Sequence, residues 1–220
     1  MSEFSLELYG SIYVLRLESE DGTNRLTRQR VLSLTAEIGR LARQASSPES
    51  AHERVTGLVI DGNARFFSAG AELAEILALD GPSAYEFSKM GQALMSTVAD
   101  FPAPVYAAIA GYCMGGGLDL ALACHLRIAS PHAIFGHRGA ALGLITGWGG
   151  TQRPPRLIGK GRALEMFVAA EKVSAPRALR MGLIDAIADD PVSGALQRLA
   201  HQSNSTAFSP LSKSLKRRDR

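Results

Sequence analysis

A run of three glycines, Gly115 to Gly117, restricts the fold of this chain more than any other feature, because it joins a strand-like apolar segment to an apolar helical segment. Glycine loses more conformational entropy on folding than other residues, so three in succession indicate that something approaches the backbone closely. The first turn of a helix also presents free N–H groups and the positive end of the helix dipole. The run therefore predicts a place for a negatively charged oxygen at the start of a helix.

Asp119 lies in the first turn of this predicted helix and is the only charged residue between Pro104 and His125. The helix dipole stabilises a carboxylate at such a position, whereas burial penalises it. This balance predicts a group that can exchange protons. The alternative is a carboxylate that only caps its helix.

The rest of the chain alternates short apolar runs with segments of helical periodicity, separated by turns rich in Gly, Pro, Asp and Ser. This alternation predicts an α/β domain with mostly parallel strand pairing. Strands are expected over 4–9, 12–17, 55–61, 105–110, 126–129, 134–135 and 183–188, and a loop over 46–52. Helices are expected over 26–45, 72–79, 83–99, 149–158, 162–170, 174–182 (with Ser174 as N-cap and Gly182 as the stop) and 192–202, in addition to the helix after the glycine run.

The charge of the chain is concentrated at its C-terminal end. The net charge is +3, yet the five Lys/Arg and one Asp of 213–220 supply +4, which leaves 19 basic and 20 acidic residues elsewhere. A basic tail on a nearly neutral body gives little support for a nucleic-acid-binding surface, so no nucleic-acid partner is expected.

Two cysteines, Cys113 and Cys124, stand in apolar surroundings, and no signal-peptide pattern precedes them. This usage is typical of a cytoplasmic protein with buried thiols. No apolar run reaches the ~18 residues of a membrane span, so no membrane partner is expected. No cluster has the spacing of metal ligands, so no metal site is expected.

Four segments in order carry a family resemblance. They are AGYCMGGGLDLALAC at 110–124, RFFSAGAELAEI at 65–76, FGHRGAALGLITGWGGTQRPPRLIG at 135–159 and SAPRALRMGLIDAI at 174–187. Together they resemble the crotonase family, also called the enoyl-CoA hydratase/isomerase superfamily, from Gly10 to about Lys216. The resemblance implies a crotonase-like (ClpP/crotonase) spiral of ββα units with mostly parallel sheets surrounded by helices. It also implies an acyl-CoA thioester substrate in fatty acid metabolism, no cofactor beyond the coenzyme A of the substrate, and a homo-trimer or hexamer.

The same resemblance implies particular site residues. Two backbone N–H groups, of Ala71 and Gly116, would form an oxyanion hole that holds the thioester carbonyl, and Asp119 would be the acid/base. The alternative for both glycine-rich turns is tight chain reversal alone. The remaining residues that the resemblance places against the substrate are Ser68, Ala69, Gly70, Leu73, Gly115, His137, Gly139 and Leu142.

The chain departs from the hydratase pattern at one catalytic position. Hydratases of the family use two glutamates, and here the first position is Asp119 and the second falls on Gly139, which has no side chain. One alternative is therefore a one-base enoyl-CoA isomerase or a decarboxylase that acts on a CoA or carrier-bound thioester. Another is a non-catalytic homologue that binds acyl-CoA.

Other polar and aromatic residues have competing interpretations. We expect His137 to be a loop or edge histidine that faces solvent. The alternative is that an extended segment places it inward, on the same face as Gly139, as a proton carrier. His125 is expected at the end of a helix, where the dipole favours it. Trp148 and Tyr112 belong either to the core or to an acyl pocket, and Arg153 is expected to be structural.

The domain organisation follows from the resemblance. A crotonase core is expected over 1–188, followed by a truncated C-terminal helical segment with a basic tail over 189–220. Relatives usually continue with helices that cover the acyl pocket and pack between subunits, so a more open pocket is expected here. The tail is expected to be a frayed terminus, and the alternative is a segment near the CoA phosphates.

Overall fold

Two sheets form the framework of the protein in a computed structural model that describes residues 3–46 and 55–203. The larger sheet has the order β1-β2-β3-β5-β7-β10 and is parallel except for the β1–β2 hairpin. The smaller sheet has the order β4-β6-β8-β9 and is parallel except between β8 and β9. The larger sheet's strands are β1 (Phe4–Tyr9), β2 (Ile12–Leu17), β3 (Gly57–Asp61), β5 (Val105–Ile109), β7 (Leu126–Ala129) and β10 (Ala186–Ile187); the smaller sheet's are β4 (Phe66–Ser68), β6 (Tyr112–Met114), β8 (Ile134–Gly136) and β9 (Val173–Ser174).

The chain steps from the larger sheet to the smaller one three times, and helical segments follow each step. The steps are β3 to β4, β5 to β6 and β7 to β8. This repeat confirms the expected spiral of ββα units. The helical elements are α1 (Arg28–Ser46), α2 (Leu73–Leu77), α3 (Gly81–Ala99), α4 (Gly116–Ala123), η1 (Arg138–Leu142, a 3-10 turn), α5 (Arg153–Ile158), α6 (Lys160–Val168), α7 (Ala175–Met181) and α8 (Pro191–Ser203).

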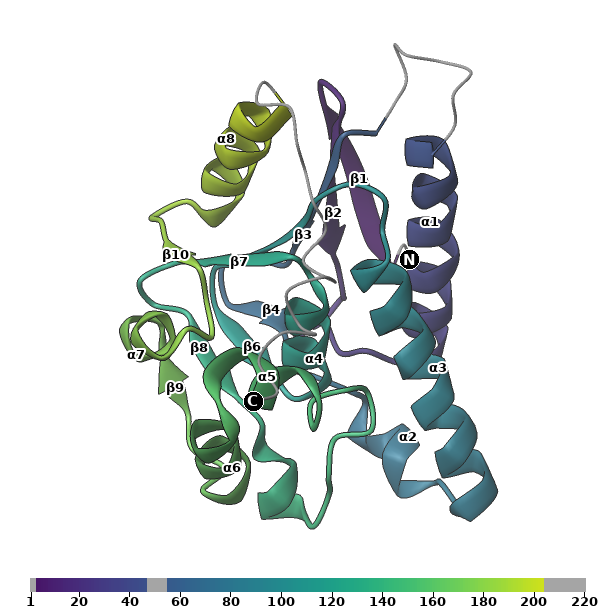
Figure 1. The fold of residues 1–220 in the computed structure, drawn as a ribbon. Coiled ribbons are helices and arrows are strands. Elements are labelled where there is room, and N and C mark those ends of the chain that lie inside the picture. Colours follow the sequence, from purple (N-terminus) through teal and green to yellow (C-terminus); the bar gives the residue numbers. More distant parts are fainter. Residues whose placement is uncertain (1–2, 47–54, 204–220) are drawn as a thin grey trace.

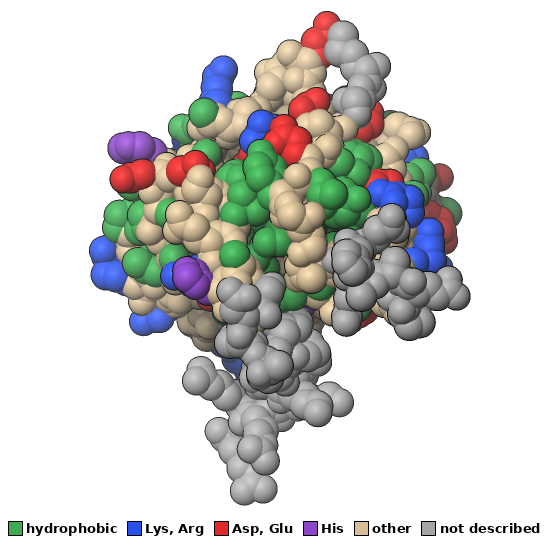
Figure 2. Space-filling view, turned by 90° about the horizontal axis from the view of Figure 1, so that it is seen from above, with side chains coloured by type: hydrophobic (Ala, Val, Ile, Leu, Met, Phe, Trp, Pro, Cys, Tyr) green, Lys and Arg blue, Asp and Glu red, His purple; other side chains and the backbone are tan. Residues whose placement is uncertain are grey.

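The hydrophobic interior forms two clusters, one on each side of the larger sheet. α1 packs against α3, and α3 packs against α4, on one side of the larger sheet (Figure 1). Every residue of α4 is buried, which fits a segment that is apolar on nearly all sides. On the opposite side, α8 packs on β3, β5 and β7 over a smaller cluster that includes Ile12, Val59 and Tyr106. Figure 2 shows the end of the molecule away from α6, where hydrophobic side chains gather near the middle of the face.

Local signals explain where several helices begin and end. Asp80 accepts from the Ser83 N–H at 2.9 Å and Pro82 stands in the first turn of α3, which fixes its start. Gly182 ends α7 with φ +82°, as expected. Ser174 does occupy the N-cap position of α7, but its side chain makes no capping hydrogen bond.

Some predicted boundaries are wrong. The helix expected over 149–158 begins only at Arg153, because the chain turns at Gly149 with φ +106°. The strand expected over 183–188 is reduced to β10. Four short elements, β4, β6, β9 and η1, were not predicted. The three strands have two or three residues, and their pairing depends on the neighbouring strand rather than on local pattern. The loop expected over 46–52 lies, after its first residue, outside the described residues, and so does the basic tail.

Candidate active site

The carboxyl ends of three neighbouring parallel strands of the smaller sheet meet at one edge. β4 leads into the turn that holds Ala71, β6 leads into Gly116 at the start of α4, and β8 leads into His137. Ser68 pairs with Cys113, and Met114 pairs with Gly136, so the three strand ends are level. Ligands in α/β sheets bind at such an edge, where the chain leaves adjacent strands.

The backbone of Ala71 is held by a strand-like contact with Leu26. The Leu26 N–H donates to Gly70 O at 2.8 Å, and the Glu72 N–H donates to Leu26 O at 3.3 Å. Successive N–H groups of an extended chain point to opposite sides, so the Ala71 N–H is directed away from Leu26. No acceptor for this N–H is found within 3–46 and 55–203.

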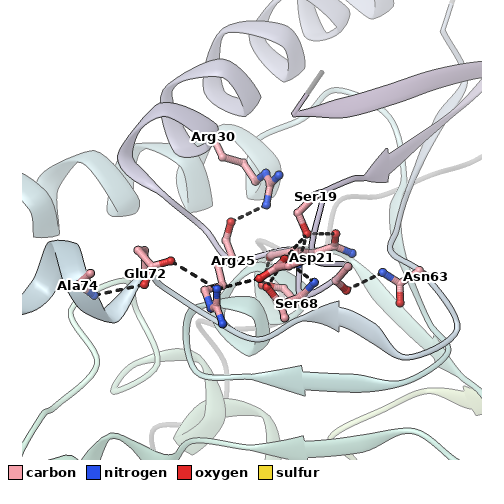
Figure 3. A network of polar contacts seen from close by, with 11 residues as sticks. Ser19, Asp21, Arg25, Arg30, Asn63, Ser68, Glu72 and Ala74 are labelled. Atoms are coloured by element: carbon pink, nitrogen blue, oxygen red, sulfur yellow. Dashed lines mark hydrogen bonds and ion pairs between the residues drawn. The ribbon is translucent and has the colours of Figure 1, made fainter. Parts of the chain in front are cut away.

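A buried polar network fixes the turn before Ala71 (Figure 3). Ser68 is fully buried, and its hydroxyl donates to Asn24 O at 2.7 Å while accepting from the Gly70 N–H at 3.1 Å. Arg25 lies between Asp21, at 2.9 Å, and Glu72, at 3.8 Å. The Ser68 hydroxyl is thus occupied within the protein, and its part in a site is to hold this turn.

The glycines that begin α4 allow close packing on three sides. A methyl group added at Gly116 would lie 2.7 Å from Cζ3 of Trp148 and 3.3 Å from the Ala71 nitrogen. One added at Gly117 would lie 2.6 Å from Cβ of Ser68. Gly115 has φ +51°, which a larger residue adopts only with strain. These contacts place the Ala71 nitrogen next to Gly116, and the Gly116 N–H, in the first turn of α4, also lacks an acceptor among the described residues.

Asp119 lies one turn further along α4 and is 2% exposed. Its Oδ1 is 3.2 Å from Nε2 of His137, and its Oδ2 accepts from the Thr146 hydroxyl at 2.6 Å. A methyl group added at Gly150 would collide with Oδ1, so the carboxylate is enclosed on that side too. The alternative, that Asp119 only caps its helix, does not account for these two side-chain partners.

The expectation that His137 faces solvent is wrong. The side chain is 6% exposed, and its ring meets that of Phe167 edge-on at 5.1 Å between centroids. The reason is tertiary: β8 pairs with β6 on one side and β9 on the other, so the residue after it emerges between α4 and α6. The alternative, an inward histidine, is confirmed.

The geometry assumed for Gly139 is also wrong, because His137 and Gly139 do not share an extended segment. Residues 138–142 form the 3-10 turn η1, closed by the Leu144 N–H, which donates to Gly139 O at 2.8 Å. A methyl group at Gly139 would lie 2.9 Å from Leu144 O. A side chain at this position therefore requires the backbone to move.

A cavity of about 500 Å³ lies beside the Asp119–His137 pair. His137 and Thr146 provide polar groups in its wall, whereas most of the other lining residues are apolar. Its apolar wall includes Leu144, Ile145, Pro155, Leu164, Phe167 and Val168. Ile145, Leu164 and Val168 are 82%, 63% and 71% exposed, so the outer rim is an unusually open apolar surface.

The remaining residues predicted for the site divide into two groups. Gly139 lies in the cavity wall, and Leu73 and Leu142 are 46% and 59% exposed, so both leucines are accessible to a ligand. Ala69 and Gly115 are tied into the backbone instead: the Ala69 N–H donates to Thr23 O and the Gly115 N–H to Gly136 O, each at 2.9 Å.

Trp148, Tyr112 and Arg153 lie outside the cavity wall. Trp148 is a core residue, since its ring packs on Phe87 and its Nε1–H donates to Phe87 O at 3.1 Å. Tyr112 contacts Phe66 and does not line the cavity. Arg153 is structural, as expected, and donates to main-chain oxygens.

His125 follows α4 but does not act there as a cation. Its Nδ1 accepts from the Val105 N–H at 2.9 Å, which requires a lone pair on that nitrogen. Burial, with the nearby Arg127 charge, lowers the pKa of His125 below its usual 6.5. His125 therefore lies just after the end of α4, as expected, but it is held there by the hydrogen bond that it accepts rather than by the helix dipole.

Thr146 and the cavity face of α6 were missed in the sequence. Thr146 is the only hydroxyl or charged side chain between Arg138 and Thr151, which is the signal that would have identified it. On α6, Leu164, Phe167 and Val168 line the cavity at helical spacing, but the same spacing is typical of an ordinary core face.

Two further kinds of feature are absent from residues 3–46 and 55–203. These residues contain no group of His, Cys, Asp or Glu arranged to hold a metal ion. They also contain no helix with the length and hydropathy needed to cross a membrane.

Comparisons with known proteins agree on one family. The family profile described as enoyl-CoA hydratase/isomerase matches residues 10–218. A probable enoyl-CoA hydratase of Bacillus subtilis is 44% identical over 137 residues, which are 62% of this chain and 53% of that protein. A crotonyl-CoA hydratase of Syntrophomonas wolfei is 39% identical over 131 residues, 59% of this chain and 50% of that protein. The aligned stretch thus spans about half the length of these curated relatives.

Solved structures extend the similarity over nearly the whole chain. DspI of Pseudomonas aeruginosa superposes with a TM-score of 0.84 and 32% identity, covering 96% of this chain and 78% of that one. An enoyl-CoA hydratase from Bacillus anthracis superposes with a TM-score of 0.84 and 29% identity, covering 93% of this chain and 78% of that one.

Proposed function

The chain belongs to the enoyl-CoA hydratase/isomerase family, and on that premise we propose that it binds an acyl-CoA thioester and stabilises the enolate formed from it. The observation that carries the proposal is the pair of N–H groups at Ala71 and Gly116, close together and without acceptors among the described residues. The thioester oxygen accepts a hydrogen bond from each N–H. Its negative charge grows when a proton leaves the α-carbon or a nucleophile adds to the β-carbon.

Backbone donors of this kind stabilise the transition state more than the ground state, because they point at the place where charge develops. Each typically contributes ~10²- to 10³-fold in rate. The dipole of α4 adds to the effect, because Gly116 is its first residue. The Asp119–His137 pair, one turn along α4, supplies the acid/base function at the adjacent carbon.

The mostly apolar lining of the cavity supports the proposal that the acyl part of the substrate is apolar. It adjoins the Asp119–His137 pair, so a chain attached to the reacting carbons would extend between η1 and α6. Burying apolar carbon in it contributes about 0.8 kcal/mol per methylene group. Coenzyme A is part of this substrate, and no separate cofactor is proposed.

Hydration of an enoyl-CoA is the proposed reaction, in line with the names of the two curated relatives. A one-base reaction, such as double-bond migration, is the second candidate, and Gly139 favours it because no second carboxylate is present at that position. The two buried free cysteines support the proposed cytoplasmic location, and an enoyl-CoA substrate would place the protein in fatty acid metabolism.

A homo-trimer or hexamer is the proposed assembly. The exposed apolar side chains of Leu164 and Val168 on α6 support a subunit contact. Light scattering on the purified chain should give three or six times the mass of 23.4 kDa, and a monomer would contradict this.

The experiment that tests the function follows crotonyl-CoA hydration by the loss of conjugated thioester absorbance, and butyryl-CoA α-proton exchange in D₂O by mass spectrometry. The variant Ala71→Pro removes one N–H donor. Its control is Gly81→Pro, at the first position of α3, where proline is tolerated and an added side chain meets nothing within 4 Å. We expect both reactions to fall at least ~10²-fold in Ala71→Pro and to persist in Gly81→Pro. Saturable binding of crotonyl-CoA by the parent without either reaction would instead identify a binding protein.

A further inference from the structure

We propose that His137 is the group that exchanges protons with the substrate, and that Asp119 and Thr146 are positioning residues behind it. This inference rests on the proposed function and deepens it. The first observation concerns access. His137 and Thr146 line the cavity, whereas Asp119 does not.

Both oxygens of Asp119 are already occupied. Oδ2 accepts from the Thr146 hydroxyl at 2.6 Å, which leaves Oδ1 for Nε2 of His137 at 3.2 Å. The residue is 2% exposed, and Gly150 closes the remaining side. A proton can reach this carboxylate from the cavity only through the imidazole or by displacing Thr146.

The second nitrogen of His137 is available. With Nε2–H donating to the carboxylate, the lone pair lies on Nδ1. No partner for Nδ1 is found in the described chain, yet Nδ1 is not among the fully enclosed polar side-chain atoms that lack a hydrogen bond there. Nδ1 therefore keeps access to the cavity, and the ring contact with Phe167 fixes its direction.

Several charged or titratable groups lie around His137. Asp119 Oδ1 is 3.2 Å from Nε2. Arg153 and Cys113 interact electrostatically with Asp119, and Lys160 lines the cavity. A carboxylate that orients an imidazole and stabilises its cation is the arrangement of the Asp–His part of a catalytic triad.

One such base is sufficient for both candidate reactions. In hydration, Nδ1 takes a proton from water as its oxygen bonds to the β-carbon, and the π electrons move to the thioester oxygen to give the enolate. The imidazolium then returns that proton to the α-carbon. In double-bond migration, Nδ1 removes a proton from one carbon and returns it to another through the same enolate. The side chain absent at Gly139 is needed in neither case.

The test combines removal of the ring with chemical rescue. His137→Ala should lower crotonyl-CoA hydration and butyryl-CoA α-proton exchange by ~10²- to 10⁴-fold, and added imidazole should restore both in a saturable manner. Thr146→Val should lower kcat and move its pH dependence, because Oδ2 loses its donor and the carboxylate is freed to turn. The control is His132→Ala, an exposed residue, which should change neither rate and show no response to imidazole.

The outcomes separate this inference from the proposed function. If the parent catalyses neither reaction, the proposed function fails and this inference fails with it. If the parent is active, a His137→Ala variant of undiminished activity overturns the inference alone. The inference is also overturned if folded His137→Ala is not rescued by imidazole and Asp119→Asn loses more activity than His137→Ala does. Should His137→Ala not fold, His137→Gln replaces it, and a pH profile of kcat/KM unchanged from the parent would overturn the inference.

Discussion

At the scale of single residues, the candidate site combines a buried Asp–His pair with a glycine, Gly139, where the family pattern has a glutamate. The structure explains why Gly139 is not simply a vacant place for a glutamate: η1 brings the Leu144 carbonyl to within 2.9 Å of where its Cβ would be. The sequence alone shows the missing carboxylate but not this contact, because the contact is made by a turn that closes five residues later.

The variant Gly139→Glu is therefore expected not to gain hydratase activity and to lose about 1–3 kcal/mol of unfolding free energy through overpacking. Ala140→Glu, on the same turn but exposed, is its control and should unfold like the parent. Urea denaturation and crotonyl-CoA hydration measure the two effects. If Gly139→Glu hydrates crotonyl-CoA faster than the parent and is equally stable, position 139 can accept the second catalytic carboxylate, and this prediction is wrong.

His125 gives a prediction for pH. Its native pKa lies below the unfolded value of 6.5, so between these two values the unfolded state binds more protons. The free energy of unfolding should consequently fall as the pH is lowered from 7 through this window. The amide oxygen of His125→Asn can still accept from the Val105 N–H. In this variant, the decrease of the unfolding free energy with falling pH should disappear over this window. Urea titrations at several pH values test this, and an equal loss of slope in His132→Asn would contradict the assignment.

At the scale of elements, the sequence predicted most of what forms the framework. Both strands of the β1–β2 hairpin were predicted to the residue, because alternation around a glycine turn is a local signal. The order of the smaller sheet could not be predicted from pattern, since its strands have two or three residues. The site depends on that order, because it brings Ala71, Gly116 and His137 together. The sequence analysis named all three residues, but it expected His137 to face solvent, and only the structure shows that this side chain is buried.

Arg127 on β7 joins three elements near the end of α4. Its side chain donates to Cys124 O and Leu183 O, both at 2.9 Å, and to Asp185 Oδ2 at 2.7 Å. Arg127→Met leaves two buried carbonyls without their side-chain donor and removes the guanidinium from Asp185, whose Oδ2 keeps only the residue 127 N–H at 2.8 Å. The unfolding free energy should therefore fall by about 3 kcal/mol. Arg138→Met, on the exposed side of η1, should change it by less than ~0.5 kcal/mol. Equal midpoints for the two variants in urea would contradict this role.

At the scale of the whole molecule, two backbone N–H groups and an Asp–His pair lie at one edge of a small sheet, beside an open apolar cavity. The glycine run that restricts the sequence most is also the point where the parts meet: it packs on Trp148, approaches the Ala71 nitrogen and begins α4. The acyl-binding side could not be predicted, because cavity-lining residues of α6 have the same pattern as core residues.

The central claim is that the Ala71 and Gly116 N–H groups hold the thioester oxygen. The most direct measurement is the infrared difference spectrum of hexadienoyl-CoA, unlabelled minus ¹³C-labelled at the thioester carbonyl, bound to the parent and to Ala71→Pro. The account predicts a carbonyl stretch at lower frequency in the parent complex than in water, because two donors weaken the C=O bond. It also predicts that much of this shift is lost in Ala71→Pro. A bound thioester whose carbonyl stretch equals that of the free ligand would contradict the account.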